Sequence, residues 1–189
     1  MSTVSRAGLK LEEALQAFRV DLRGKTVLDI GASTGGFTEA ALRAGARKVI
    51  AVEKGTNQMK APLRFDERVE LHEKTDVFEF ALAEKPDVVV ADVSFVSLTK
   101  VLTYARKNLA GRETEYVVML KPQFEAKPWQ LKDGILKNHK MRREVIADFE
   151  TWLKRNDFVV VGKKDNSLAG RFGNVERFYY LRAAITPKR

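Results

Sequence analysis

Short apolar runs rich in β-branched residues alternate along the chain with longer segments whose apolar residues recur at the helical period. The runs that we expect to form strands are Thr26 to Ile30, Lys48 to Glu53, Val69 to Glu73, Asp87 to Asp92 and Tyr116 to Lys121. The segments that we expect to form helices are Leu9 to Phe18, Thr38 to Ala44, Val77 to Ala83 and Leu98 to Leu109. This alternation is typical of a parallel sheet with helices on both faces.

The pattern changes after the fifth predicted strand. An irregular segment, KPQFEAKPWQLKDG, precedes a long charged helix predicted from about His139 to Arg155. Two further strands are expected at Phe158 to Gly162 and Arg177 to Leu181, joined by a polar loop of a length that suits a hairpin. The sequence therefore predicts an α/β fold with a mostly parallel seven-stranded sheet and an antiparallel C-terminal hairpin.

Length and composition limit the class of protein. A chain of 189 residues, 44% of them hydrophobic, is expected to form one domain spanning residues 1–189. It has no apolar run long enough to cross a bilayer, and its first residues, MSTVSRAGLK, lack the apolar core of a signal peptide, so we expect a cytoplasmic protein. With no cysteine and only His72 and His139 as histidines, we expect no disulfide, no cysteine nucleophile and no metal site.

The net charge of +9 and the pI near 9.7 favour a polyanionic partner. Clustered lysine and arginine side chains gain affinity for nucleic acid by releasing counterions from its phosphates. Charge alone does not identify the partner, because many basic proteins bind no nucleic acid.

A glycine turn, LDIGASTGGFT, follows the first predicted strand, where open α/β sheets bind ligands. The turn lacks the lysine and the spacing of a phosphate-binding P-loop. A dinucleotide fingerprint would place its middle glycine, which approaches a pyrophosphate, where Ser33 stands between Gly31 and Gly36. Glu53 nevertheless follows at about the offset of an acid that binds ribose hydroxyls. Together these features indicate adenosine recognition without a pyrophosphate, as S-adenosylmethionine requires.

Other residues near the turn are candidates for the same site. Asp76 follows the third predicted strand and can bind the adenine edge, cap a helix, or do both. The alternative to ribose binding for Glu53 is that its side chain is simply solvated at the end of the second strand. The predicted cofactor-binding residues are Asp29, Gly31, Ser33, Gly36, Glu53, Asp76 and Asp92.

The fourth and fifth predicted strands end in Asp92 and Lys121, whose side chains should face the cofactor. Burial disfavours the charged form of a lysine, which makes Lys121 a candidate general base. Alternatively, its stem packs against the protein while its ammonium group reaches water. From this residue alone, the second interpretation is favoured.

Five ordered motifs spanning nearly the whole chain resemble a known family. They are SRAGLKL at Ser5 to Leu11, LDIGASTGGFT at Leu28 to Thr38, DVSFVSL at Asp92 to Leu98, KPQFE at Lys121 to Glu125 and GNVE at Gly173 to Glu176. Together they resemble the TlyA (haemolysin A) branch of the FtsJ-like RNA methyltransferases. The resemblance implies a Rossmann-like fold and transfer of a methyl group from S-adenosylmethionine to a ribose 2'-hydroxyl of ribosomal RNA, at a cytidine by analogy.

The resemblance also implies a catalytic tetrad of Lys10, Asp92, Lys121 and Glu176. We expect Lys121 to accept the proton of the ribose hydroxyl. Lys10 would keep Lys121 partly neutral by like-charge repulsion. The two acids, Asp92 and Glu176, would orient the ammonium groups and the hydroxyl. Because coupled groups titrate as a unit, the assignment among the four stays open. Cytosine carbon-5 methylation by a cysteine nucleophile is disfavoured, and DVSF lacks the two prolines common in exocyclic-amine methylation.

RNA contacts are expected near the active-site rim, although a solvated helix face with packed aromatic residues is an alternative. The predicted RNA-binding residues are Arg6, Phe124, Trp129, Lys132, Lys137, Lys140, Arg142 and Arg143, with Lys163, Lys164 and Arg171 as weaker candidates. Three positions depart from the family pattern KGGVVRDPxxH: Lys137 replaces Arg, His139 replaces Pro and Arg142 replaces His. We also expect no N-terminal RNA-binding module. An NAD-dependent oxidoreductase and a non-catalytic RNA-binding or haemolysin-like protein remain the alternative functions.

Overall fold

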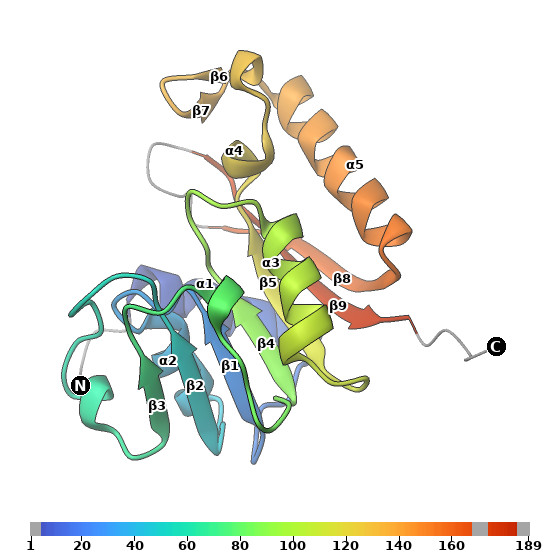
Figure 1. Ribbon diagram of the computed structural model, residues 1–189. Helices are drawn as coiled ribbons and strands as arrows, with labels where there is room; N and C mark the ends of the chain where they lie inside the picture. The colour runs from blue at the N-terminus through green and yellow to red at the C-terminus, as the bar shows by residue number, and fades with distance from the viewer. Residues whose placement is uncertain (1–4, 168–173, 185–189) are drawn as a thin grey trace.

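Within residues 5–167 and 174–184, which this computed structural model describes, one sheet has the strand order β3-β2-β1-β4-β5-β9-β8 (Figure 1). Strands β1 to β5 are parallel, and β9 is antiparallel to both of its neighbours. The bounds are β1 (Thr26–Ile30), β2 (Lys48–Val52), β3 (Val69–His72), β4 (Val88–Ala91), β5 (Glu115–Leu120), β8 (Phe158–Asp165) and β9 (Arg177–Ala183). The predicted sheet and its C-terminal hairpin are confirmed.

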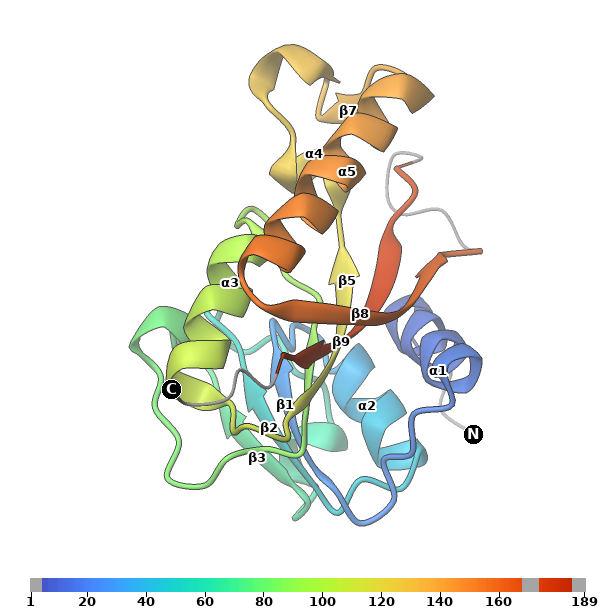
Figure 2. The same cartoon turned by 90° about the vertical axis from the view of Figure 1, so that its right-hand side faces the viewer.

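Helices cover both faces of this sheet. They are α1 (Arg6–Phe18), α2 (Gly36–Arg43), α3 (Leu98–Tyr104), α4 (Pro122–Glu125) and α5 (His139–Arg155), and a π-helical turn, η3 (Ala105–Leu109), extends α3. Helices α1 and α2 lie on one face, and α3 and α5 lie on the other (Figures 1 and 2). This arrangement explains the continuous apolar runs, because successive strand residues must pack against different helix layers. In β1, Leu28 and Ile30 pack in the cluster of α3 and α5, whereas Val27 packs in the cluster of α1 and α2.

One predicted helix, Val77 to Ala83, is wrong. Only a 3-10 turn, η2 (Val77–Glu79), forms there, and Asp76 caps it by accepting a hydrogen bond from the Phe78 N–H. The chain then returns to extended backbone at Phe80, whose side chain is buried beside α3. Burial of this ring in the core competes with continuation of the helix.

The segment after β5 is more ordered than the sequence indicated. It contains α4, the turn η4 (Pro128–Gln130) and a two-stranded hairpin of β6 (Leu131–Lys132) and β7 (Ile135–Leu136). Asp133 and Gly134 turn the hairpin with φ angles of 53° and 75°, the left-handed region that an Asp-Gly pair tolerates. We call residues 122–143, from α4 to the first turn of α5, the rim. It projects beyond the carboxyl end of β5 (Figures 1 and 2).

Candidate active site

Strand topology brings three of the predicted catalytic residues to one edge of the sheet. Asp92 follows β4 and Lys121 follows β5, and these two strands are parallel neighbours. Glu176 immediately precedes β9, which runs antiparallel to β5 with Arg177 opposite Leu120. The beginning of β9 therefore lies beside the end of β5, so residues far apart in sequence meet there.

Two ion pairs form at this edge. The Lys121 Nζ lies 2.7 Å from the Asp92 Oδ1 and donates a hydrogen bond of 2.7 Å to the Ser94 Oγ. The Lys10 Nζ, from the buried side of α1, lies 2.5 Å from the Glu176 Oε2. The ammonium of Lys121 thus points toward Asp92 and Ser94, with only 13% of its side chain exposed.

Electrostatics link the two pairs. Burial raises the pKa of the Asp92 carboxyl above its usual range, and the Lys121 ammonium offsets part of that rise. The Glu176 carboxylate raises the pKa of Asp92 further, and the Lys10 ammonium lowers it. The structure therefore brings all four residues of the predicted tetrad into one electrostatic cluster.

A cavity of about 640 Å³ adjoins the cluster at the carboxyl ends of β1, β2 and β4. Asp92 and Ser94 line it and also bind Lys121, so they connect the cavity to the tetrad. Gly31 lines it as well, with a φ of 84°. A Cβ at Gly31 would lie 3.0 Å from the Asp92 carbonyl oxygen, so both its backbone angle and the close approach of the next strand require glycine.

Glu53 is fixed on the cavity wall at the end of β2. Its Oε2 accepts a hydrogen bond of 2.8 Å from the Ser33 N–H, and its Oε1 accepts one of 2.6 Å from the Gly55 N–H. Ser33, also on the wall, donates from its hydroxyl to the Gln58 side chain. The backbone bonds hold the carboxylate in place, and each oxygen retains a lone pair for a ligand hydroxyl.

Asp76 also lies on the cavity wall. Its carboxylate caps η2 and also pairs with the Lys54 ammonium at 2.8 Å. Both residues line the cavity, and the hydrogen bond from Lys54 lowers the pKa of Asp76. The expected capping role is therefore present in the structure, and a second role toward a ligand is compatible with it.

Two predicted cofactor residues are placed behind the cavity rather than on its wall. Asp29 is fully buried and accepts a hydrogen bond of 2.6 Å from the Thr38 hydroxyl. Gly36 begins α2, and a Cβ there would lie 2.3 Å from the Ser5 Oγ, so close packing of α1 requires this glycine. Both residues therefore support the glycine turn from behind the cavity wall.

Comparison with known proteins shows the family of the chain. A model of the FtsJ-like methyltransferase family matches residues 3–183. The 23S rRNA (cytidine-2'-O)-methyltransferase TlyA of Campylobacter jejuni is 39% identical over 179 residues, which make up 94% of this chain and 70% of the relative. The chain belongs to the FtsJ-like methyltransferase family.

Solved structures share the fold. A proposed hemolysin from Streptococcus thermophilus, 36% identical, has a TM-score of 0.91 and covers 99% of this chain and 69% of that one. A proposed S-adenosylmethionine dependent methyltransferase from Listeria monocytogenes, 14% identical, has a TM-score of 0.63, with 92% and 99% covered. The seven-stranded sheet is thus the fold of S-adenosylmethionine-dependent methyltransferases, and the family supports methyltransferase activity.

An aromatic pair stands at the entrance to the site of this FtsJ-like methyltransferase. Phe95 lines the cavity with 92% of its surface exposed and a φ of 62°. Its ring packs against Phe124 of α4 at a centroid distance of 5.2 Å. Phe124 was predicted from the sequence and Phe95 was not, although its place in the DVSF motif, three residues after Asp92, was an available signal.

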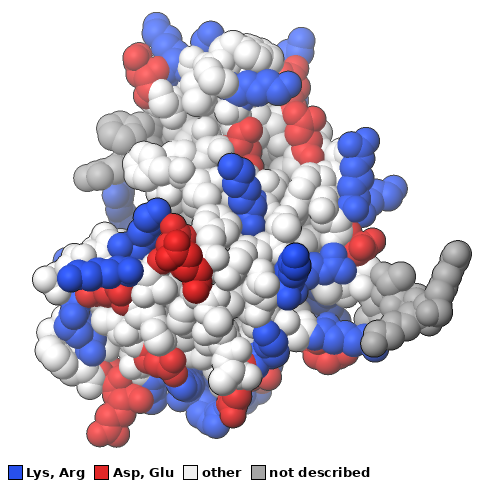
Figure 3. All heavy atoms as spheres, viewed as in Figure 1, with Lys and Arg blue, Asp and Glu red and all other residues white. Residues whose placement is uncertain are grey.

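Apart from Phe124, the predicted RNA-binding residues fall into two groups. Arg6, Trp129, Lys132, Lys137, Lys140 and Arg143 are exposed. Arg142 instead donates to the Val175 carbonyl and the Asp165 carboxylate, so the structure does not present it to a ligand. Lysines and arginines are spread over the viewed face among acidic residues rather than gathered in one patch (Figure 3).

The weaker RNA candidates are also distributed. Lys163 and Lys164 lie on β8, where they pair with Glu150 and Glu13. Arg171 lies outside the described residues. No helix in the described part of the chain is long and apolar enough to span a membrane.

Proposed function

We propose that this protein is an S-adenosylmethionine-dependent RNA 2'-O-ribose methyltransferase whose substrate is ribosomal RNA, at a cytidine by analogy with the Campylobacter jejuni relative. The observation that carries the proposal is the Lys121–Asp92 pair held by Ser94 at the cavity wall, with the Lys10–Glu176 pair beside it. A ribosomal RNA substrate places the reaction in the cytoplasm.

The cavity residues fit S-adenosylmethionine. Glu53 offers carboxylate oxygens at the end of β2 for two ribose hydroxyls, and Asp76 offers an acceptor for the adenine amino group. The turn at Gly31 lets the backbone approach a ligand closely, and Ser33 replaces the glycine that a pyrophosphate needs. When bound, the cofactor supplies an electrophilic methyl group.

The tetrad provides the proton chemistry. A ribose 2'-hydroxyl is a weak acid, so its oxygen attacks efficiently only when a positioned group removes the proton. Lys121 is the proposed acceptor because its nitrogen binds Asp92 and Ser94, two residues that line the cavity. With its amine neutral, Lys121 would take the hydroxyl proton while the methyl group leaves the cofactor's sulfur for the ribose oxygen, and Asp92 would stabilise the resulting ammonium. For Lys10, which binds Glu176, we propose a role in orienting the attacking oxygen in addition to the repulsion that keeps Lys121 partly neutral.

The rim is the proposed RNA-binding surface. The exposed basic residues there, Lys132, Lys137, Lys140 and Arg143, can contact phosphates. The Phe95–Phe124 pair stands where the nucleobase of the target ribose would enter, and Trp129 is 57% exposed nearby on the rim.

Replacing Phe95 with alanine should raise the KM for RNA by about 5- to 100-fold, because base stacking on an aromatic ring contributes about 1–3 kcal/mol. Because Phe95 also lines the cavity, cofactor affinity is measured separately from RNA binding. Steady-state kinetics with calorimetric titration of S-adenosylmethionine would check both, and Phe65→Ala provides a control because Phe65 is exposed on η1 (Leu63–Phe65). An unchanged KM would contradict the stacking role.

The proposed function is tested by transfer of a tritiated methyl group from S-adenosylmethionine to isolated ribosomal subunits and to naked ribosomal RNA. Alkaline hydrolysis should leave labelled dinucleotides, because a 2'-O-methyl group blocks cleavage at its phosphodiester. Label on mononucleotides would mean base methylation and would contradict the proposal. Cofactor binding without transfer to either RNA would favour a non-catalytic binder.

A further inference from the structure

Three consecutive residues before β9 connect the rim to the catalytic tetrad. The first, Asn174, is buried and bonds the β6–β7 hairpin through both atoms of its amide. Its Oδ1 accepts from the Leu136 N–H at 3.4 Å, and its Nδ2 donates to the Gly134 carbonyl at 3.3 Å. Asn174 therefore attaches the rim hairpin to the strand end that carries Glu176.

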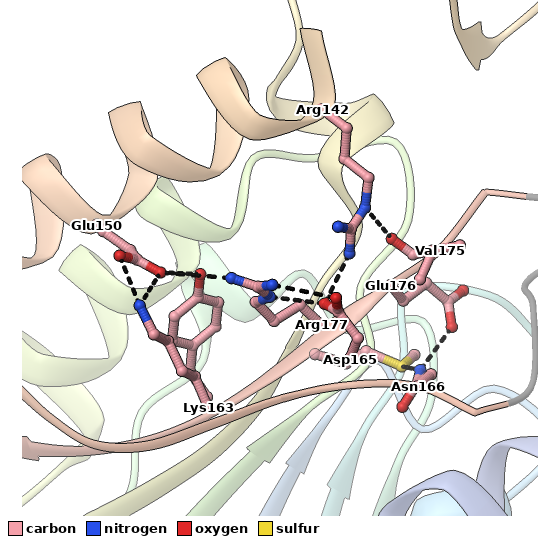
Figure 4. A network of polar contacts seen from close by, with 10 residues as sticks. Arg142, Glu150, Lys163, Asp165, Asn166, Val175, Glu176 and Arg177 are labelled. Carbon is pink, nitrogen blue, oxygen red and sulfur yellow. Dashed lines mark hydrogen bonds and ion pairs between the residues drawn. The ribbon is translucent and has the colours of Figure 1, made fainter. Parts of the chain in front are cut away.

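The second contact is made by Arg142 on the first turn of α5. Its Nε donates to the Val175 carbonyl at 3.1 Å, and its Nη2 binds the Asp165 carboxylate at 2.7 Å (Figure 4). Only 16% of the Arg142 side chain is exposed. One guanidinium thus ties the start of α5 to the residue before Glu176 and to the end of β8.

The third residue, Glu176, is held on its other side. Asn166 donates from its side chain to the Glu176 Oε2 at 3.0 Å and from its backbone to the Glu176 carbonyl at 3.0 Å. Arg177 binds Asp165, the carboxylate that Arg142 also binds, and the hydrogen bond from Arg177 lowers the pKa of Asp165 to about 2. Figure 4 shows both guanidinium groups converging on this carboxylate.

We propose that Arg142 and Asn174 are positioning residues that fix Glu176, and through it Lys10, relative to the rim. The proposal rests on the proposed function, because it assigns these residues to the alignment of the methyl-transfer site. The Glu176 Oε2 accepts from both Asn166 and Lys10, so a shift of Glu176 moves the Lys10 ammonium with it. RNA bound on the rim is thereby kept aligned with the catalytic tetrad.

This role differs from the RNA contact that the sequence predicted for Arg142. Loss of a phosphate contact raises the KM for RNA and lowers the salt dependence of binding. Loss of a positioning contact leaves both unchanged and lowers kcat, because small misplacements of reacting groups slow the reaction strongly. The two roles are therefore separable by kinetics.

The experiment compares Arg142→Gln with Arg155→Gln, which removes the same charge from the exposed end of α5. We expect Arg142→Gln to lower kcat by roughly 10- to 100-fold, while the KM for RNA, its salt slope and S-adenosylmethionine affinity stay within about twofold of wild type. Arg142→Lys, which can reach one acceptor but not bridge both, should recover part of kcat. Arg155→Gln should match wild type.

If Arg142→Gln does not fold, Asn174→Ser takes its place with the same expectation, because it removes the hairpin contacts and keeps a small polar side chain. A kcat equal to that of Arg155→Gln, or a raised KM with a lower salt slope, would overturn the positioning role. Parallel loss of cofactor affinity would overturn it too, because it would show a structural effect. If wild-type protein methylates no RNA, the proposed function has failed instead.

Discussion

Replacing Lys121 with alanine should reduce methyl transfer to RNA by about 10²- to 10⁴-fold, the usual contribution of a positioned proton acceptor. Without the amine, water must take the proton of the ribose hydroxyl, and Asp92 loses the cation at 2.7 Å from its Oδ1. S-adenosylmethionine affinity should change little, because Lys121 does not line the cavity. Single-turnover kinetics and calorimetric titration would measure the two effects.

Lys107→Ala is the matched control for this experiment, since it removes an exposed lysine from η3. It should keep wild-type kinetics. Lys121→Arg retains the charge but replaces the amine with a group that stays protonated, so it should be nearly as impaired as the alanine variant. Wild-type turnover in Lys121→Arg would contradict proton acceptance, because a permanent cation would then be sufficient.

The centre of the sheet was predictable because β1, β2, β4 and β5 are short apolar runs buried on two faces. The parallel pairing of β1 with β2 and of β4 with β5 follows from the helices α2 and α3 that connect them, and the C-terminal hairpin follows from two adjacent runs joined by a polar loop. The helix at Val77 to Ala83 failed because burial of Phe80 in the core outweighs local periodicity. The β6–β7 hairpin has strands of two residues, too short for a periodic signal, although its Asp-Gly turn was visible.

The site was predictable to different degrees. Asp92 and Lys121 end neighbouring parallel strands, so the pattern alone places them together. Lys10 and Glu176 required the family resemblance, because their meeting depends on how α1 packs and on the register of β9.

The positive charge of Arg142 was not sufficient to predict its role. The sequence predicted an RNA contact for Arg142, but its guanidinium donates to the Val175 carbonyl and to the Asp165 carboxylate. No local pattern distinguishes these two uses of an arginine.

Asp29 gives the second large effect, a loss of stability as pH rises. It is fully buried beneath the glycine turn, and burial raises its pKa from 3.8 to about 7, although the Thr38 hydroxyl favours the charged form. The folded state therefore keeps its proton to higher pH than the unfolded state does. This contribution is fully present below pH 4 and is lost as pH rises through about 7, because folding then buries a carboxylate.

Between pH 5 and pH 8, ionisation of Asp29 alone should lower the free energy of unfolding by roughly 3 kcal/mol. Asp29→Asn should remove this part of the slope, because the amide keeps the shape and the acceptor for Thr38 but cannot ionise. Urea denaturation of both proteins at the two pH values measures it as a double difference. Asp165, whose pKa is about 2, is ionised throughout this window, so Asp165→Asn should leave the slope unchanged. Equal slopes for wild type and Asp29→Asn would show that Asp29 is already ionised at pH 5, and that the buried turn tolerates its charge.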